Sequence, residues 1–236
     1  YIAFTPDREA GDQLLQVSGL TKTIDGEKVL NNVSFTLKKG DKVAFVGPNT
    51  VGKTALFEIL MGKREADEGS FKWGVTTTQS YLPKDNNDFF DDVELNLVDW
   101  LRQYSKDPDE TFVRGFLGRM LFSGEESQKR AEVLSGGERV RCMLSRMMLS
   151  GANVLIFDEP TDHLDLESIT ALNNGLMSFS GTILFASRDH EFTQTVANRI
   201  IEITPVGIVD RISTYDEYLS NETVKQQLAE KYKTVG

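Results

Sequence analysis

One eight-residue stretch, residues 47–54, constrains this chain more than any other part of its sequence. Its letters, GPNTVGKT, fit the pattern G-x-x-x-x-G-K-[ST], in which backbone N–H groups surround phosphate oxygens. An apolar run of strand length precedes it at residues 42–46, and residues 55–61 follow with helical periodicity. Such a unit presents loop amides and the positive end of a helix dipole to an anion. The stretch predicts a nucleoside triphosphate site formed by Gly47, Pro48, Asn49, Thr50, Val51, Gly52, Lys53, Thr54 and Ala55.

A few side chains are expected to carry the chemistry at this site. Lys53 would reach the β- and γ-phosphates, and the Thr54 hydroxyl would ligate Mg²⁺. The apolar residues 154–157 predict a buried strand that delivers Asp158 to the ligand-binding edge of a parallel sheet, where it would also hold Mg²⁺. Glu159, the next residue, would orient or deprotonate the attacking water. The pattern therefore predicts hydrolysis of a triphosphate assisted by a divalent cation.

The order of the apolar segments predicts an α/β fold. Apolar strands without polar alternation, separated by helices, are typical of a parallel sheet covered on both faces. Asp25-Gly26 lies between two strand-like segments near the start of the chain and predicts an antiparallel hairpin. Residues 83–148 are polar and largely helical in pattern, which predicts an inserted helical subdomain. The expected fold is a P-loop NTPase with a mainly parallel sheet core, an antiparallel β subdomain and this helical insertion.

Length and composition limit the remaining architecture. With 236 residues, of which 39% are hydrophobic, the chain suits one well-cored domain, expected at residues 13–220. Residues 1–12 are expected to be a loosely held linker remnant, and residues 221–236 a C-terminal helical tail. No run of 18 apolar residues is present, so membrane insertion is not expected. The single cysteine suits a reducing cytoplasm, and the net charge of −10 argues against a free-standing nucleic-acid binder.

A second glycine-rich turn opens another predicted helix. Ser135 and Glu138 have the spacing of a capping box, so helix initiation alone explains this pair. Gly136 and Gly137 are harder to explain in this way, because each weakens a helix by up to about 1 kcal/mol. They are expected if the backbone approaches an anion that a partner domain holds at the helix N-terminus.

These motifs occur in the order of an ABC-type ATPase domain, which the whole chain resembles. The resemblance rests on the two glycine-rich turns, Gln79, residues 154–160 and the pair Leu164-Asp165. It implies that ATP and Mg²⁺ are bound, and that Gln79 links Mg²⁺ and the γ-phosphate to the helical subdomain. It also implies that two domains pack head to tail around two ATP molecules. Each domain would then face the γ-phosphate held by the other with its signature turn, Ser135, Gly136, Gly137 and Glu138.

Finer features resemble the ABC-F branch of these proteins. They are the basic residue Arg139 after Ser-Gly-Gly-Glu, the segment TDHLDLE at residues 161–167 and Lys-Trp-Gly at residues 72–74. ABC-F proteins carry two ATPase domains without transmembrane parts, and characterised members act at the ribosome with a linker that reaches toward tRNA. The chain is therefore expected to be the second, C-terminal domain of a cytoplasmic ABC-F protein. Its expected partners are another ABC domain and, through the full-length protein, the ribosome and tRNA.

A few positions depart from the family pattern. Asp162 stands where asparagine is usual, and Ile24 stands where an aromatic residue commonly stacks on adenine. Arg188 stands where a histidine contacts the γ-phosphate, and His190 follows two residues later. Arginine can contact a phosphate but stays charged and cannot accept a proton. We therefore expect a site that binds ATP well and hydrolyses it slowly, unless His190 substitutes.

Two other functions remain open from the sequence. The cytosolic ATP-binding subunit of a membrane transporter would share all of this chemistry and differ in its partner. An ATP-dependent clamp with little hydrolysis would also fit, because Arg188 replaces the histidine. Since half of each site comes from a partner domain, we expect the isolated chain to be a monomer with little or no ATPase activity.

Overall fold

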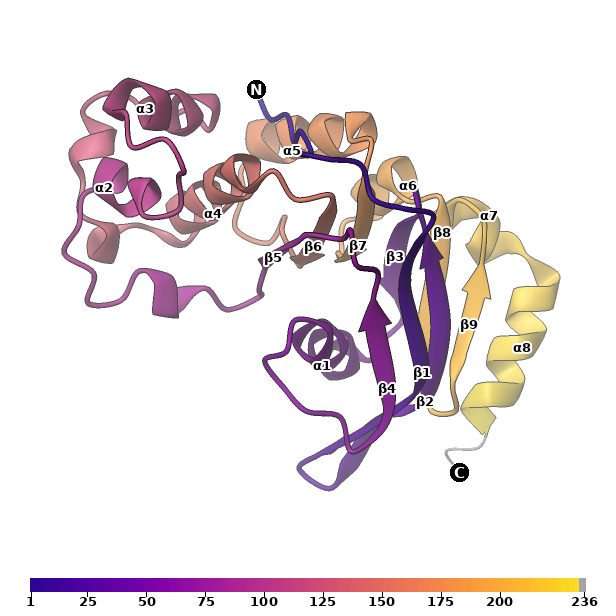
Figure 1. Ribbon diagram of the computed structural model, residues 1–236. Coiled ribbons are helices and arrows are strands. Elements are labelled where there is room, and N and C mark those ends of the chain that lie inside the picture. Colours follow the sequence, from indigo (N-terminus) through magenta and orange to yellow (C-terminus); the bar gives the residue numbers. More distant parts are fainter. Residues whose placement is uncertain (234–236) are drawn as a thin grey trace.

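The structure, a computed structural model, describes residues 1–233 and contains two β-sheets surrounded by helices (Figure 1). Within these residues the larger sheet has six strands in the order β5-β6-β7-β3-β8-β9. All neighbours in it are parallel except β8 and β9. The strands are β3 (Lys42–Val46), β5 (Gln79–Leu82), β6 (Val154–Asp158), β7 (Thr182–Ala186), β8 (Arg199–Ile203) and β9 (Ile208–Arg211). The mainly parallel core predicted from the sequence is confirmed.

A smaller antiparallel sheet packs beside this core in the order β2-β1-β4. Its strands are β1 (Gln13–Ile24), β2 (Glu27–Lys38) and β4 (Glu68–Trp73). The hairpin turns at Asp25 and Gly26, whose φ angles of 50° and 78° are the left-handed values that a two-residue hairpin turn requires. The predicted turn is confirmed. Backbone pairing in both hairpin strands continues through polar positions, whose side chains mostly face solvent.

Helices cover both faces of the larger sheet, and a group of them forms a lobe to one side (Figure 1). α1 (Thr50–Leu60) packs on one face and α5 (Leu166–Ser178) on the other. The lobe contains α2, α3 and α4, joined by short 3₁₀ turns. The remaining bounds are α2 (Leu97–Arg102), α3 (Glu110–Arg119), α4 (Gly136–Ser150), α6 (His190–Val196), α7 (Tyr215–Ser220), α8 (Glu222–Lys233) and the 3₁₀ turns Asn87–Phe89, Glu126–Gln128 and Ala131–Val133.

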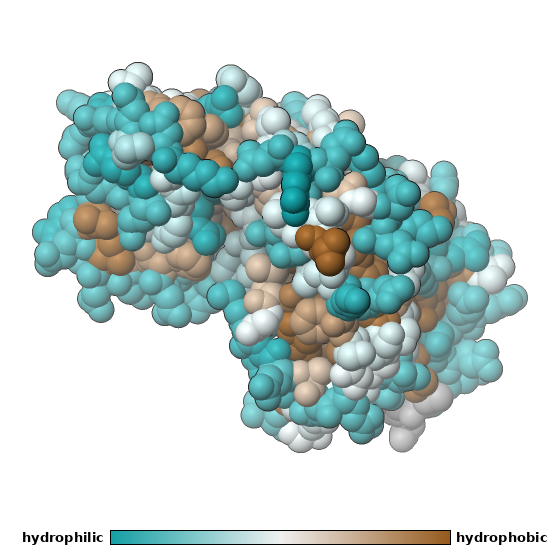
Figure 2. Space-filling model, in the orientation of Figure 1, coloured by the Kyte–Doolittle hydropathy of each residue, from teal (hydrophilic) through white to brown (hydrophobic). Residues whose placement is uncertain are grey.

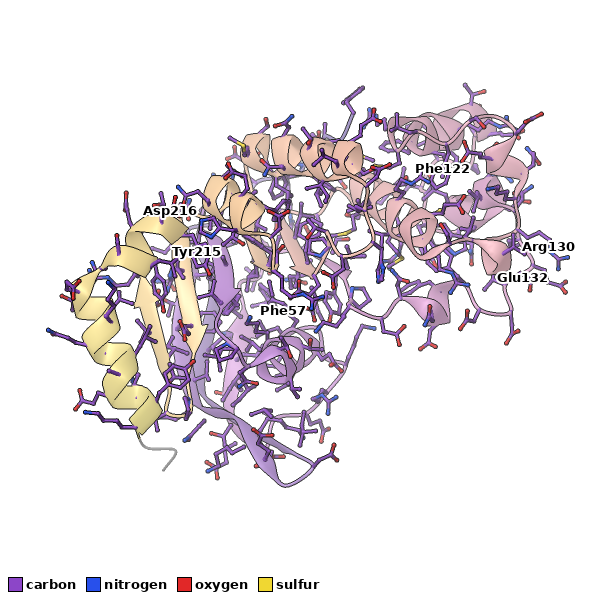
Figure 3. All side chains as sticks on the ribbon, turned by 180° about the vertical axis from the view of Figure 1, so that it is seen from behind. Phe57, Phe122, Arg130, Glu132, Tyr215 and Asp216 are labelled. Carbon is purple, nitrogen blue, oxygen red and sulfur yellow. The ribbon has the colours of Figure 1, made fainter. Side chains whose placement is uncertain are left out.

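Hydrophobic cores lie on the two faces of the larger sheet, and β6 contributes alternate side chains to each. Beneath α1, Phe57 meets Phe45 edge to face with 5.5 Å between the ring centroids (Figure 3). In the helical lobe, Trp100 stacks on Phe90 at 4.8 Å. The first contact fixes α1 against β3, and the second stabilises the interior of the helical lobe.

The start of the chain differs from the sequence prediction. Ile2 and Phe4 are buried. The Phe4 ring packs edge to face on Phe157 and Phe179, with centroid distances of 6.1 and 6.3 Å. The prediction of a loosely held segment is therefore wrong here, because two apolar side chains anchor an otherwise polar stretch.

The end of the chain contains two helices, α7 and α8, and α8 lies within the predicted helical tail. Asn221 separates them and accepts a hydrogen bond from the Val224 amide at 2.9 Å, which starts α8. Residues 234–236 of the predicted tail lie outside the described residues. Among residues 1–233, no helix combines the length and the apolar character that a bilayer crossing requires.

Candidate functional site

The loop between β3 and α1 holds its backbone in a shape that suits phosphate. Gly47 has a φ of +100°, and a Cβ at this position would lie 2.8 Å from the Cγ of Glu202 on β8. The Asn49 side chain accepts a hydrogen bond from the Gly52 amide at 2.8 Å and caps α1. Because of this cap the helix begins at Thr50, earlier than the predicted residues 55–61. The first turn of α1 therefore lies within the stretch that is predicted to bind phosphate.

Lys53 folds back across this loop. Its Nζ donates to the Gly47 carbonyl oxygen at 2.6 Å, and the residue is buried. Burial lowers the pKa of Lys53, whereas the nearby Glu159 carboxylate opposes that shift. A buried ammonium group with a carbonyl as its hydrogen-bond acceptor can exchange that acceptor for an anion. Among the other residues of the predicted loop, Ala55 is buried in the core. The exposed residues are Pro48, Thr50 and Val51.

Thr54 and Asp158 bring two oxygen ligands together at the end of β6. The Thr54 Oγ1 donates to Asp158 Oδ2 at 2.6 Å, and Asp158 is buried. Burial raises the pKa of the Asp158 carboxyl, and the hydrogen bond from Thr54 opposes this. Mg²⁺ takes oxygen ligands, typically one or two from the protein together with substrate phosphates and water. The pair therefore fits the predicted metal position.

Glu159 is held beside that pair in an unusual backbone conformation. Its φ of 53° lies in the left-handed region, which residues with a side chain rarely adopt. The Glu159 amide donates to the Ala186 carbonyl at 2.8 Å, which fixes the turn after β6 against the end of β7. The side chain is only 3% exposed, and burial, together with the neighbouring Asp162, raises the pKa of its carboxyl. A strained backbone and a raised carboxyl pKa both suit the predicted role as a base.

Arg188 lies next to Glu159, on the loop that follows β7. Its backbone amide donates to Glu159 Oε2 at 3.1 Å, and its Nη2 donates to Asp162 Oδ2 at 2.7 Å. His190, the other candidate for this position, is the first residue of α6, and its Nε2 lies 2.7 Å from Asp216 Oδ1. Figure 3 places Asp216 at the start of α7. The structure therefore brings Arg188, and not His190, into contact with Glu159.

Gln79 lies at the wrong end of its strand for the role predicted. β5 runs parallel to β6 with Gln79 opposite Val154, which is four residues before Asp158. At ~3.3 Å per residue, that offset is about 13 Å along the sheet. The Gln79 Nε2 donates instead to Thr77 Oγ1 at 2.8 Å. The prediction that Gln79 touches Mg²⁺ and the γ-phosphate is wrong, because the motif order does not reveal which strand residue reaches the edge.

Lys84 lies at the end of the sheet that carries Asp158, and it was not among the residues predicted from the sequence. It follows the end of β5 by two residues. Its charge opposes the burial-driven rise in the pKa of Asp158 and adds slightly to the burial-driven lowering of the pKa of Lys53. Lys84, Thr54, Tyr81 and also Gln79 line a cavity of about 720 Å³, and Figure 2 shows the molecule hollowed between the helical lobe and the lobe that carries α1. The signal available in the sequence was the end of the apolar strand, since the next polar side chain stands at the sheet edge.

The second glycine-rich turn makes its contacts within the chain. The Ser135 Oγ accepts from the Glu138 amide at 3.2 Å, and Glu138 Oε1 accepts from the Ser135 amide at 3.1 Å. The predicted capping box is therefore confirmed at the start of α4. A Cβ on Gly137 would lie 2.6 Å from the His163 carbonyl oxygen, whereas one on Gly136 would lie 3.5 Å from the nearest atom of His163. Close approach of the His163 backbone thus explains one of the two glycines.

A comparison with protein-family models covers both motifs of the phosphate site. It matches residues 30–162, more than half of the chain, to the family described as ABC transporter. This chain belongs to the ABC transporter ATP-binding domain family. The matched segment begins within β2 and ends after β6. It therefore includes both Thr54 and Asp158.

Curated relatives of this ABC domain are longer than the chain. The uncharacterized ABC transporter ATP-binding protein YkpA of Bacillus subtilis is 66% identical over 98% of the chain and 43% of that protein. The probable ATP-binding protein YbiT of Escherichia coli O157:H7 is 38% identical over 95% of the chain and 42% of that protein. The energy-dependent translational throttle protein EttA of Escherichia coli K12 is 32% identical over 90% of the chain and 40% of that protein. The chain spans less than half the length of each of these relatives.

Solved structures share the fold at low sequence identity. A dimeric ATP-binding cassette in a post-hydrolysis state, bound to ADP and Pi, matches with a TM-score of 0.70 and 16% identity over 84% of this ABC domain and 98% of that chain. The protein cbiO1 from Clostridium perfringens matches with a TM-score of 0.66 and 18% identity over 95% and 98%. At this level of identity the likeness concerns the fold, which is that of an ATP-binding cassette.

Proposed function

We propose that this ABC domain binds ATP with Mg²⁺ and hydrolyses it by in-line attack of water. The observation that carries the proposal is the convergence of Lys53, Thr54, Asp158 and Glu159 at one edge of the larger sheet. The ATP-binding domain would comprise residues 13–220, with the helical subdomain at residues 83–148. Titration of the chain with ATP and magnesium, followed by calorimetry, tests the first step directly. Absence of binding at millimolar ATP would contradict the proposal.

Each group at this edge has a role that follows from its position. The loop amides and Lys53 would hold the triphosphate and stabilise charge on the transferred phosphoryl group. Thr54 and Asp158 would hold Mg²⁺, which neutralises phosphate charge when bound. Glu159, buried and with a raised pKa, would accept a proton from the attacking water.

A second ABC domain in head-to-tail arrangement would complete the site. This part of the proposal is supported by the signature turn at Ser135, Gly136, Gly137 and Glu138, and by the family's dimeric relative of the same fold. The isolated chain should then be a monomer with little ATPase activity. Sedimentation and ATPase assays across a hundredfold range of concentration test this. A fast rate that does not change on dilution would contradict the need for a partner.

We also propose that the full-length protein is of ABC-F type and acts on the ribosome in the cytoplasm, with this chain as its C-terminal ABC domain. The support is the 32% identity to EttA, whose name describes a translational throttle. Ribosome co-sedimentation of the full-length protein with ATP tests it, using Glu159→Gln to retain ATP and Lys53→Met as the matched control. ATP-dependent pelleting of the Glu159 variant alone is expected. Equal pelleting of both variants would contradict the proposal.

An ATP-dependent clamp with little hydrolysis at this site is the second candidate, and the contact of Arg188 with Glu159 favours it. Restoring histidine with Arg188→His should raise turnover in the two-domain protein. Unchanged turnover would show that Arg188 does not limit hydrolysis. A transporter subunit, as the name of the YkpA relative suggests for that protein, would instead co-purify with a membrane permease.

A further inference from the structure

Asp162 and Arg188 are two of the positions at which the sequence is expected to depart from the family that it resembles, and the structure brings them into contact. The Arg188 Nη2 lies 2.7 Å from Asp162 Oδ2, and its Nε lies 3.8 Å from Glu159 Oε2. The guanidinium group therefore lies between the carboxylate of Glu159 and the carboxylate of Asp162. The two departures are linked because Asp162 supplies the negative charge that a guanidinium, unlike an imidazole, requires at neutral pH.

The backbones that carry these side chains are fixed to each other. The Glu159 amide donates to the Ala186 carbonyl at 2.8 Å, and the hydroxyl oxygens of Thr161 and Ser187 lie 3.2 Å apart. The Ser187 hydroxyl also accepts from the Asp189 amide at 3.1 Å. A change in the position of the guanidinium group therefore requires only rotation of the Arg188 side chain.

The Arg188 side chain is free to make that rotation. It is 73% exposed, whereas the Asp162 side chain is 24% exposed. Ion pairs between exposed side chains are weak, since water screens both charges and a long side chain loses entropy when held. A phosphate group offers a guanidinium two parallel hydrogen bonds and more negative charge than one carboxylate. A phosphate that arrives next to Glu159 can therefore replace Asp162 as the partner of Arg188.

We propose that Asp162 is a positioning residue that holds the Arg188 guanidinium away from the terminal phosphate of a bound triphosphate, so that this phosphate must compete for it. The inference rests on the proposed function, because Glu159 is taken to mark the γ-phosphate side of the site. ADP lacks that phosphate, and its remaining phosphates are assigned to Lys53 and the loop amides. Asp162 should therefore affect the binding of ATP and not the binding of ADP.

The test is calorimetric titration of the chain with magnesium and either ADP or a non-hydrolysable ATP analogue. Asp162→Asn keeps the size of the side chain and removes its charge. It should tighten binding of the ATP analogue by about two- to fivefold, the range for an exposed ion pair, and leave the affinity for ADP unchanged. A matched control is Glu110→Gln, which removes the exposed Glu110–Arg114 pair on α3 and should change neither affinity.

A double-mutant cycle separates positioning from simple repulsion. If Asp162 only repelled the γ-phosphate, Asp162→Asn would tighten analogue binding equally in an Arg188→Ala background. The proposal requires that the gain disappear in that background. It is overturned if the gain persists there, if it is absent in the parent, or if ADP gains equally. If the parent chain binds neither nucleotide, the proposed function itself fails, and the ADP titration of each variant also reports whether its site is folded.

Discussion

Two helices of this domain begin at glycine-rich turns, and their N-termini are arranged differently. At α1, Asn49 satisfies the Gly52 amide, and the charged groups Lys53 and Asp158 gather beside the loop. At α4, the capping box of Ser135 and Glu138 satisfies both residues' amides within the chain. The backbones of the two turns also differ. Gly47 has a φ of +100°, whereas Gly136 and Gly137 lie in the first turn of α4 with helical φ angles.

Of the two turns, only the one at the start of α1 combines the groups expected of an anion site within a single chain. It has the backbone shape, the buried Lys53 ammonium group, and the Thr54 and Asp158 oxygens proposed to hold a metal. The α4 turn is capped by Ser135 and Glu138 of its own chain, so an anion there would need further groups from another molecule. This is the structural basis for proposing one nucleotide per chain, closed by a partner.

The largest effect should come from the carboxylate beside the α1 turn. Glu159→Gln should reduce turnover of the two-domain protein by about 10²–10⁴-fold, the range for loss of a general base. ATP binding should be retained, because the loop and Lys53 are unchanged. Single-turnover assays with radiolabelled ATP measure the chemical step, and equilibrium titration measures the binding. Turnover within threefold of the parent would remove Glu159 from the proposed mechanism.

Loss of the buried cation tests the α1 turn as a binding site. Lys53→Met keeps the length of the side chain and removes the charge that faces the phosphates. Binding of ATP should weaken by about 10- to 100-fold, as expected for loss of a hydrogen bond to a charged group. Calorimetry measures this, and unchanged thermal unfolding without nucleotide serves as the control for folding. An affinity equal to that of the parent would mean that phosphates bind elsewhere.

The two glycines of the α4 turn form a matched pair. Gly137→Ala puts a Cβ 2.6 Å from the His163 carbonyl oxygen and should cost about 1–3 kcal/mol of stability. Gly136→Ala meets nothing closer than 3.5 Å and should be neutral or slightly stabilising, because alanine favours helix. Thermal unfolding of both variants measures the difference, at about 2–4 °C per kcal/mol for a domain of this size. Equal melting temperatures would show that His163 does not constrain the turn.

The smallest effect separates Lys84 from Gln79 at the edge of the α1 site. Lys84→Ala removes a charge that lies near both Lys53 and Asp158 and should change ATP affinity by about two- to fivefold. Gln79 lies at the end of β5 that is far from Asp158, so Gln79→Ala should leave the affinity for ATP unchanged. Titrations of the two variants under the same magnesium concentration make the comparison. A larger effect from Gln79 would restore the role predicted from its place in the motif order.

The parts of the fold that the sequence predicted are those in which local pattern determines structure. Strand β6 lies where it was predicted, because it is a run of apolar residues that ends at Asp158. The capping box at Ser135 and the turn at Asp25 are also confirmed, because both depend on residues only a few positions apart. The helix after the predicted phosphate loop also forms as α1, although it begins earlier than predicted.

The parts that the sequence could not predict depend on register and on distant contacts. The place of Gln79 relative to Asp158 is set by the pairing of β5 with β6. The contact between Asp162 and Arg188 joins residues 26 positions apart, brought together because β6 and β7 are neighbours. Burial of Phe4 likewise depends on Phe157, which no local pattern reveals.

The loop between β3 and α1 is expected to enclose the phosphates of ATP. The most direct measurement is a crystal structure of the chain with a non-hydrolysable ATP analogue and magnesium. We expect phosphate oxygens within hydrogen-bond distance of the backbone amides of residues 50–54 and of Lys53 Nζ, with the metal between Thr54 and Asp158. Nucleotide bound elsewhere, with Lys53 still on the Gly47 carbonyl, would contradict the account.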